Sequence, residues 1–158
     1  MHPIILQLRL YRSFSYYCLA RHNIYFTVSK TFTLGRNERL KSRKLIEALF
    51  KKGKSYNLPP FKIFYIIEPA SSGSAPLQFG VGVSSRYFKK AVDRNRVKRL
   101  IREGWRLQKG PLAEISKTAN ASLYIFIIYT GKDVPAYAAV ADKVGEVIKR
   151  QAGLFNKK

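Results

Sequence analysis

The chain has 158 residues, of which 46% are hydrophobic and 13% aromatic, which fits one folded domain and argues against a fully disordered basic tail. Its 30 lysines and arginines against 9 acidic residues give a formal net charge of +21, which favours a polyanionic partner such as RNA, DNA or an acidic membrane surface. The single cysteine, Cys18, excludes an intramolecular disulfide framework, and the only histidines, His2 and His22, exclude a multi-histidine metal site in the body of the chain.

Residues 1–34 are expected to form an N-terminal extension that carries basic residues and no acid. Three interpretations stay open. Arg9 and Arg12 interrupt the apolar stretch that a secretory signal needs, whereas the basic, serine-containing composition also fits an organellar transit peptide. We favour a poorly ordered extension, or upstream sequence translated from a misassigned start. No stretch of the chain approaches the roughly 18 apolar residues that span a bilayer.

A first amphipathic helix is expected after Ser42, whose hydroxyl can cap its start. Apolar residues then recur at helical spacing up to a stop at Gly53, and they are Leu45, Ile46, Leu49 and Phe50. The other face of this helix is basic.

Two strands are expected next, over residues 61–67 and 77–83, separated by a Pro- and Ser-rich loop at 69–76. Both faces of the first strand are partly apolar, so it should be covered on both sides or meet a ligand. In the second strand Gly80 and Gly82 share one face, which leaves room for a close approach to the backbone.

A second helix is expected over residues 91–107, ended near Gly110-Pro111, with an apolar stripe of Val97, Leu100, Ile101 and Trp105. Residues 123–129 are almost wholly apolar, which predicts a central strand. A last helix has Pro135 in its first turn and stops at Gly153. The fold class is therefore α/β, an α+β sandwich with the order helix, strand, strand, helix, strand, helix. We expect the domain to cover residues 35–154, with a basic tail at 155–158.

The second helix and the loop before it are the strongest functional feature, with nine basic and two acidic residues between Arg86 and Arg106. One helix face repeats a basic residue every four positions, as Arg94, Lys98, Arg102 and Arg106. Such like charges repel by a few tenths of a kcal/mol per pair, roughly, when no acid separates them. A solvated charged face is the alternative, but this density favours an external anion, which guanidinium forks bind through phosphate oxygens.

Groups for catalysis by the polypeptide are hard to find. The acids are scattered, Asp93 suits a helix cap better than a metal ligand, and Ser84-Ser85 suits a turn. A second cluster, Ile46, Phe50 and Phe64, could stack unpaired bases, although its periodicity alone favours plain core packing.

Two segments resemble the bacterial ribonuclease P protein component family. Residues 79–103 read FGVGVSSRYFKKAVDRNRVKRLIRE, which is similar to the family's glycine-rich strand followed by its Arg-Asn-Arg helix. Residues 39–53 read RLKSRKLIEALFKKG and look like its first helix. The resemblance covers roughly residues 34–154.

This resemblance implies the small subunit of a ribonucleoprotein that removes the 5′ leader of precursor tRNA. The large RNA would carry the chemistry and bind Mg²⁺, and the polypeptide alone would be non-catalytic. The family also implies a left-handed βαβ crossover, opposite to the general rule. We expect a cytoplasmic protein that does not bind membranes. Its expected partners are ribonuclease P RNA, bound one to one, and precursor tRNA.

The family's functional positions are carried over residue by residue. The resemblance assigns to the catalytic RNA Arg86, Lys89, Lys90, Arg94, Asn95, Arg96, Lys98, Arg99 and Arg102. It assigns to a leader-binding cleft Ile46, Phe50 and Phe64. Ile46 stands where the family often has an aromatic residue, so that part of the cleft should hold bases less well. Arg86 stands where a lysine is common, which keeps the charge.

Three other functions fit part of this pattern. A ribosomal or general RNA-binding protein would share the charge and fold class but would not select precursor tRNA. A stand-alone cationic nuclease would need paired acids or histidines that the body of the chain lacks. A membrane-surface protein would need a wide exposed apolar face beside the basic helix.

Overall fold

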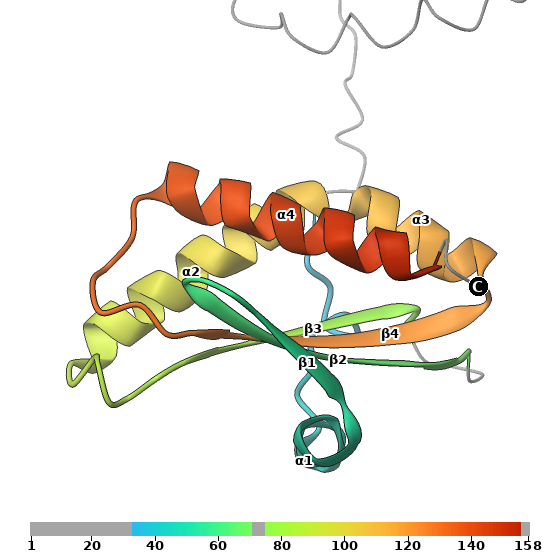
Figure 1. Cartoon of the computed structure of the whole chain (residues 1–158), viewed down its shortest axis with the longest axis horizontal. Helices are drawn as coiled ribbons and strands as arrows, with labels where there is room; N and C mark the ends of the chain where they lie inside the picture. The colour runs from blue at the N-terminus through green and yellow to red at the C-terminus, as the bar shows by residue number, and fades with distance from the viewer. Residues whose placement is uncertain (1–32, 71–74, 156–158) are drawn as a thin grey trace, which may run out of the picture.

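Four helices and four strands make up the computed structural model, which describes residues 33–70 and 75–155 (Figure 1). In chain order they are α1 (Arg43–Lys52), β1 (Lys54–Leu58), β2 (Phe61–Pro69), β3 (Leu77–Val83), α2 (Ala91–Gln108), α3 (Gly110–Thr118), β4 (Ala121–Tyr129) and α4 (Tyr137–Phe155). The predicted α+β class is confirmed. None of the helices in these residues is long and apolar enough to cross a bilayer.

The strands form one sheet in the order β1-β2-β4-β3. β4 is antiparallel to β2 on one side and parallel to β3 on the other, so its predicted central position is correct. The register of the parallel pair runs from Leu77 opposite Leu123 to Val83 opposite Tyr129. The chain crosses from β3 to β4 through α2 and α3; the left hand of this crossover stays an expectation from the family resemblance.

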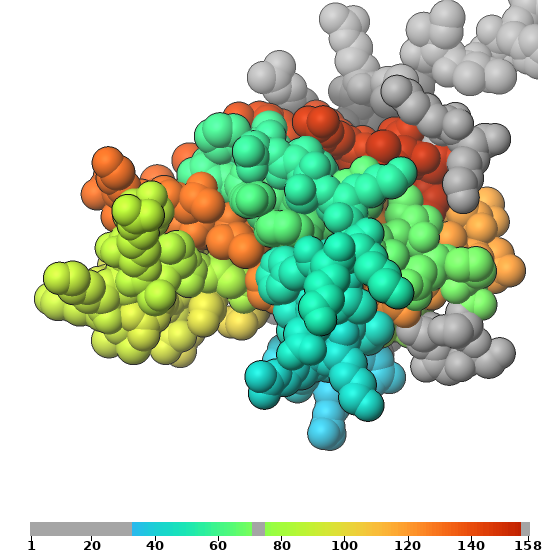
Figure 2. Space-filling model, turned by 60° about the horizontal axis from the view of Figure 1, so that its bottom comes forward, coloured from blue at the N-terminus to red at the C-terminus, as the bar shows by residue number. Residues whose placement is uncertain are grey.

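The two faces of the sheet are covered unequally. Helices α2, α3 and α4 lie over one face, and α1 alone lies over the other (Figure 1). Alternation along β4 decides which side chain faces which layer. Ile125 and Ile127 belong to the main core under α2 and α4, whereas Tyr124 and Phe126 belong to a smaller cluster under α1. Figure 2 brings the α1 side forward and shows α1 standing out from the sheet.

The main core follows the apolar stripe expected for α2. Val97, Ile101 and Trp105 are fully buried. The indole of Trp105 stacks on the ring of Phe79 in β3, with centroids 4.3 Å apart and planes 8° from parallel. This stack fixes α2 against the edge strand of the sheet.

Two elements were missing from the expected order. β1 pairs with β2 as a hairpin, and α3 follows α2 after Lys109. Gly110-Pro111 therefore begins a helix instead of closing a region, because proline fits the first turn of a helix, where its missing N–H costs no hydrogen bond.

Four expected helix ends also differ. Ser42 occupies the N-cap position of α1 but its hydroxyl makes no capping hydrogen bond. Lys90, not Asp93, is the N-cap of α2; Asp93 lies in the first turn, where its carboxylate faces the positive end of the helix dipole. Helix α4 begins at Tyr137, so Pro135 precedes the helix and does not lie in its first turn. The helix also continues past Gly153 to Phe155.

The space above Gly80 and Gly82 is filled by the ring of Phe126 in the neighbouring strand. A Cβ at position 80 would lie 2.4 Å from Cδ2 and 2.8 Å from Cε2 of that ring, and a Cβ at position 82 would lie 3.0 Å from Cε1. The close approach expected at these glycines is therefore made by a side chain of the protein itself.

A segment before α1 covers the outer edge of β3. The Leu40 amide donates to the Phe79 carbonyl at 3.0 Å, and the Phe79 amide donates to the Glu38 carbonyl at 2.8 Å. This pairing satisfies edge groups that would otherwise be open to another strand.

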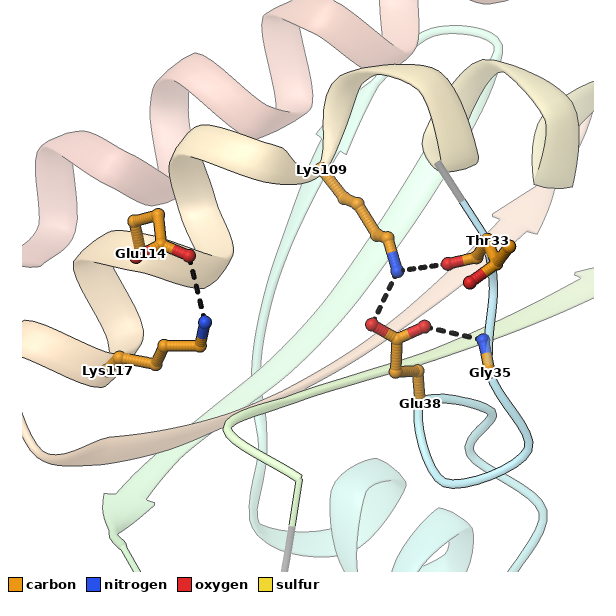
Figure 3. Close-up of polar contacts among 6 residues, drawn as sticks. All are labelled: Thr33, Gly35, Glu38, Lys109, Glu114 and Lys117. Atoms are coloured by element: carbon orange, nitrogen blue, oxygen red, sulfur yellow. Dashed lines mark hydrogen bonds and ion pairs between the residues drawn. The ribbon is translucent and has the colours of Figure 1, made fainter. Parts of the chain in front are cut away.

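The same segment is held by a buried ammonium (Figure 3). Lys109 is 5% exposed, and its Nζ donates to the Thr33 carbonyl at 2.6 Å and to Glu38 Oε1 at 2.5 Å. Glu38 Oε2 accepts a hydrogen bond from the Gly35 amide at 2.6 Å. The junction of α2 and α3 is thereby tied to the chain that enters α1.

Substituting Gly80→Ala should lower the free energy of unfolding by about 2 kcal/mol, because the new methyl group must displace the Phe126 ring. The control is Gly153→Ala in α4, where nothing lies within 4 Å of the added Cβ. It should be neutral or stabilising by up to about 1 kcal/mol. Chemical denaturation measures both, and an unchanged midpoint for Gly80→Ala would show that Phe126 does not depend on the glycine.

Candidate nucleic-acid interface

Helix α2 separates its buried and basic residues onto different faces. Val97, Ile101 and Trp105 face the core. The predicted RNA-binding residues of the helix that are exposed are Asn95, Arg96, Arg99 and Arg102, while Arg94 and Lys98 are half-buried. Arg86, Lys89 and Lys90 are exposed on the loop that leads into the helix. The structure thus places most of this set at exposed positions on α2 and on the loop directly before it.

Arg94 differs from its neighbours because its guanidinium is already engaged. Its Nη1 donates to the carbonyls of Phe88 and Lys89, both at 2.7 Å. These bonds brace the loop against the first turn of α2. Arg94 therefore positions the loop that carries Arg86, Lys89 and Lys90.

Arg106, the last basic residue of the four-residue series, is also paired. It forms an ion pair of 2.6 Å with Glu103. The hydrogen bond from Arg106 lowers the pKa of the Glu103 carboxyl below its usual value. The basic surface of α2 is consequently concentrated between Asn95 and Arg102.

The loops after β3 and β4 meet at the start of α2. Because the two strands are parallel neighbours, their following loops leave the sheet at the same edge. Between them lies an open pocket of about 400 Å³, lined by Arg86, Tyr87, Phe88, Lys89, Lys90, Asp93, Lys132, Asp133 and Val134. Lys132 was not among the predicted residues, and only the parallel pairing of the strands could have placed it here.

On the opposite layer, Phe50, Phe64 and Phe126 form what we call the aromatic shelf. Phe50 makes edge-to-face contacts with Phe64 at 4.8 Å and with Phe126 at 5.3 Å between ring centroids. Phe50 nevertheless stays 41% exposed. The ammonium of Lys62 lies 5.3 Å from the centroid of the Phe64 ring. An aromatic surface with a cation beside it suits a single-stranded nucleic acid.

Ile46 and Phe64 are both half-buried and pack against the cluster of Leu40, Leu49 and Tyr124 beneath α1. Of the three residues of the predicted cleft, Phe50 alone is exposed. Phe126 was missed because residues 123–129 are apolar on both faces, so the sequence did not show which residues face α1.

Figure 2 shows α1 in cyan to teal and the loop and first turns of α2 in yellow-green on one visible face. Among residues 33–70 and 75–155, no three His, Cys, Asp or Glu side chains are grouped so that they could hold a metal ion. Ser84 and Ser85 lie in the turn after β3.

Comparisons with known proteins place the chain in a family. The family model described as Ribonuclease P matches residues 34–151. The chain belongs to this family. A ribonuclease P protein component from Porphyromonas gingivalis is 32% identical over 129 residues, which cover 80% of this chain and 92% of that protein. One from Chlorobium phaeobacteroides is 30% identical over 73% of this chain and 86% of that protein.

Solved structures of ribonuclease P proteins share the fold. The protein from Thermotoga maritima matches with a TM-score of 0.54 at 25% identity, over 72% of this chain and 96% of that one. The Staphylococcus aureus protein matches with a TM-score of 0.52 at 21% identity, over 72% and 94%, which shows the fold alone. Membership makes this chain the protein subunit of the ribonuclease P holoenzyme, an endoribonuclease of tRNA 5′ maturation, and ribonuclease P RNA its partner.

Arg94→Gln should lower the free energy of unfolding by about 1–2 kcal/mol, because it removes charge-assisted hydrogen bonds to two loop carbonyls. The matched variant Arg96→Gln, at an exposed position on the same helix, should change stability by less than about 0.5 kcal/mol. Denaturant unfolding of the two free proteins distinguishes the positioning arginine from the surface arginine. Equal stabilities would contradict the bracing role.

Proposed function

We propose that the exposed basic surface of α2 binds the RNA subunit of ribonuclease P, while the aromatic shelf holds the 5′ leader of precursor tRNA. The observation that carries this is the division of the molecule into two surfaces of different chemistry. One is a row of cations on a rigid helix, and the other is an aromatic surface in which Phe50 is exposed and the ammonium of Lys62 lies beside Phe64.

The basic surface suits a folded RNA because it is charged and rigid. Helix α2 is anchored by Trp105 in the core, so Arg96 and Arg99 are presented at fixed spacing. Cations that neutralise phosphates release condensed counterions, which gives affinity without sequence readout. The pocket beside Lys132 adds a cation from a second loop to the same surface.

The aromatic shelf suits an unpaired strand because its outer ring is supported from below. Phe64 and Phe126 meet Phe50 with their edges or faces, so the ring keeps one orientation while part of it stays open to solvent. A base can stack on such a ring whatever its identity. Because Ile46 and Phe64 are half-buried against the cluster beneath α1, Phe50 is the principal stacking residue in this proposal.

The polypeptide then contributes binding and positioning, and the RNA subunit contributes the chemistry. In this proposal Mg²⁺ is bound through the RNA, the protein and RNA associate one to one, precursor tRNA is the substrate, and the complex acts in the cytoplasm. Binding energy realised on the leader would align the substrate with the catalytic RNA, an effect of orientation.

Arg96→Ala combined with Arg99→Ala should weaken binding to ribonuclease P RNA and flatten the dependence of log K on log salt by about 2. Lys117→Ala with Lys149→Ala, which removes two exposed charges from α3 and α4, is the matched control. Titrations at several salt concentrations measure the slope. A slope equal to that of the wild type would contradict the role given to α2.

Phe50→Ala should reduce holoenzyme affinity for precursor tRNA about tenfold, because one stacking contact is worth about 1–3 kcal/mol, and leave affinity for mature tRNA unchanged. Tyr137→Ala is a close control, since Tyr137 on α4 is 40% exposed against 41% for Phe50. Binding of both RNAs to reconstituted holoenzyme is measured. An equal loss of affinity for precursor and mature tRNA would show that Phe50 contributes only to core packing and does not contact the leader.

A further inference from the structure

Two arginines from separate elements converge beside the Phe79–Trp105 stack. Arg39 lies directly opposite Phe79 in the parallel bridge that covers the edge of β3. Arg102 lies three residues before Trp105, hence on nearly the same side of α2. Since the Phe79 and Trp105 rings are stacked at 4.3 Å, the two arginines are held next to each other by backbone and core contacts.

The acids adjacent in sequence to these arginines are engaged elsewhere. Glu38, adjacent to Arg39, is bound by Lys109 and by the Gly35 amide. Glu103, adjacent to Arg102, is bound by Arg106. In the part of the chain that the structure describes, neither Arg39 nor Arg102 forms an ion pair.

The positive charge of Arg39 acts electrostatically on the guanidinium of Arg102. Burial, and after it the neighbouring guanidinium of Arg39, lower the pKa of Arg102 below its ordinary value. The fold holds these two like charges together, and the carboxylates adjacent to them in sequence are paired with other cations. The two guanidinium groups therefore repel each other in the free protein. An anion placed between them would convert this repulsion into two attractive contacts.

We propose that Arg39 and Arg102 together bind one phosphodiester group of the ribonuclease P RNA backbone, so that the segment before α1 is part of the RNA interface. This inference rests on the proposed function of α2 and extends it to a second element. Guanidinium groups match phosphate oxygens through paired N–H donors, and two of them approaching from different elements can grip a single phosphate. Inorganic phosphate has the same chemistry and serves as the probe for the free protein.

The first arm measures thermal unfolding of the free protein at low ionic strength with and without inorganic phosphate. Arg39→Gln and Arg102→Gln should each unfold at a temperature equal to or above that of the wild type, because the repulsion is gone. Each should also respond less to phosphate. Lys117→Gln, which removes one exposed charge from α3, should keep the full response. A lowered melting temperature with an unchanged phosphate response would show a merely structural role and overturn the inference.

The second arm measures affinity for ribonuclease P RNA across salt concentrations. Arg39→Gln and Arg102→Gln should each weaken binding about tenfold and reduce the salt slope by about 1. Because both groups grip one phosphate, the double variant should lose little more than either single variant. Fully multiplicative losses would overturn a shared phosphate. A lost phosphate response with wild-type RNA affinity would mean a site for free anions and would overturn the RNA assignment.

The Arg96→Ala, Arg99→Ala variant separates failure of this inference from failure of the proposed function. If that variant binds RNA weakly while Arg39→Gln matches Lys117→Gln, the paired site is wrong and the role of α2 stands. If neither variant changes RNA binding, both the proposed function of α2 and the paired site are wrong.

Discussion

The buried ammonium of Lys109 connects the elements that carry both functional surfaces. It ends α2 and binds Glu38 and the Thr33 carbonyl, which lie ahead of α1 in the chain (Figure 3). An ammonium with so little exposure is tolerated only when paired, since a buried charge without a partner costs several kcal/mol, roughly. Because Leu40 then pairs with the edge of β3 and α1 begins at Arg43, this contact helps to set where α1 lies over the sheet and where Arg39 meets α2.

The two faces of the sheet support different surfaces of the protein. One face carries the main core, in which Trp105 and Phe79 hold α2 rigidly enough to present cations at fixed spacing. The other face is only partly covered by α1. There the Phe126 ring lies on Gly80 and supports Phe50 from below, so an aromatic ring can stay exposed without being loose. The same central strand, β4, contributes to both layers through its alternating side chains.

Much of this was accessible from the sequence, for physical reasons. The glycine-containing strand at residues 77–83 and the start of α2 at Ala91 were predicted with their correct bounds, because strong β-formers and a long helical stripe mark them. β1 was missed because its five residues are short and mostly exposed, and α3 because Gly110-Pro111 resembles a stop. Charge identified the basic surface, but charge alone could not show that Arg94 binds carbonyls or that Arg39 and Lys132 join from other elements. Those placements depend on strand order, which the sequence pattern left open.

The most direct test of the central claim is reconstitution of 5′-leader removal. The purified protein would be mixed with a bacterial ribonuclease P RNA and a labelled precursor tRNA at a low Mg²⁺ concentration, with each component also assayed alone. The account predicts that cleavage at the mature 5′ end appears when protein and RNA are combined and is absent from either one alone. Tight binding to the RNA without any stimulation of cleavage, repeated with the RNA of a closely matched species, would contradict it and favour a general RNA-binding protein.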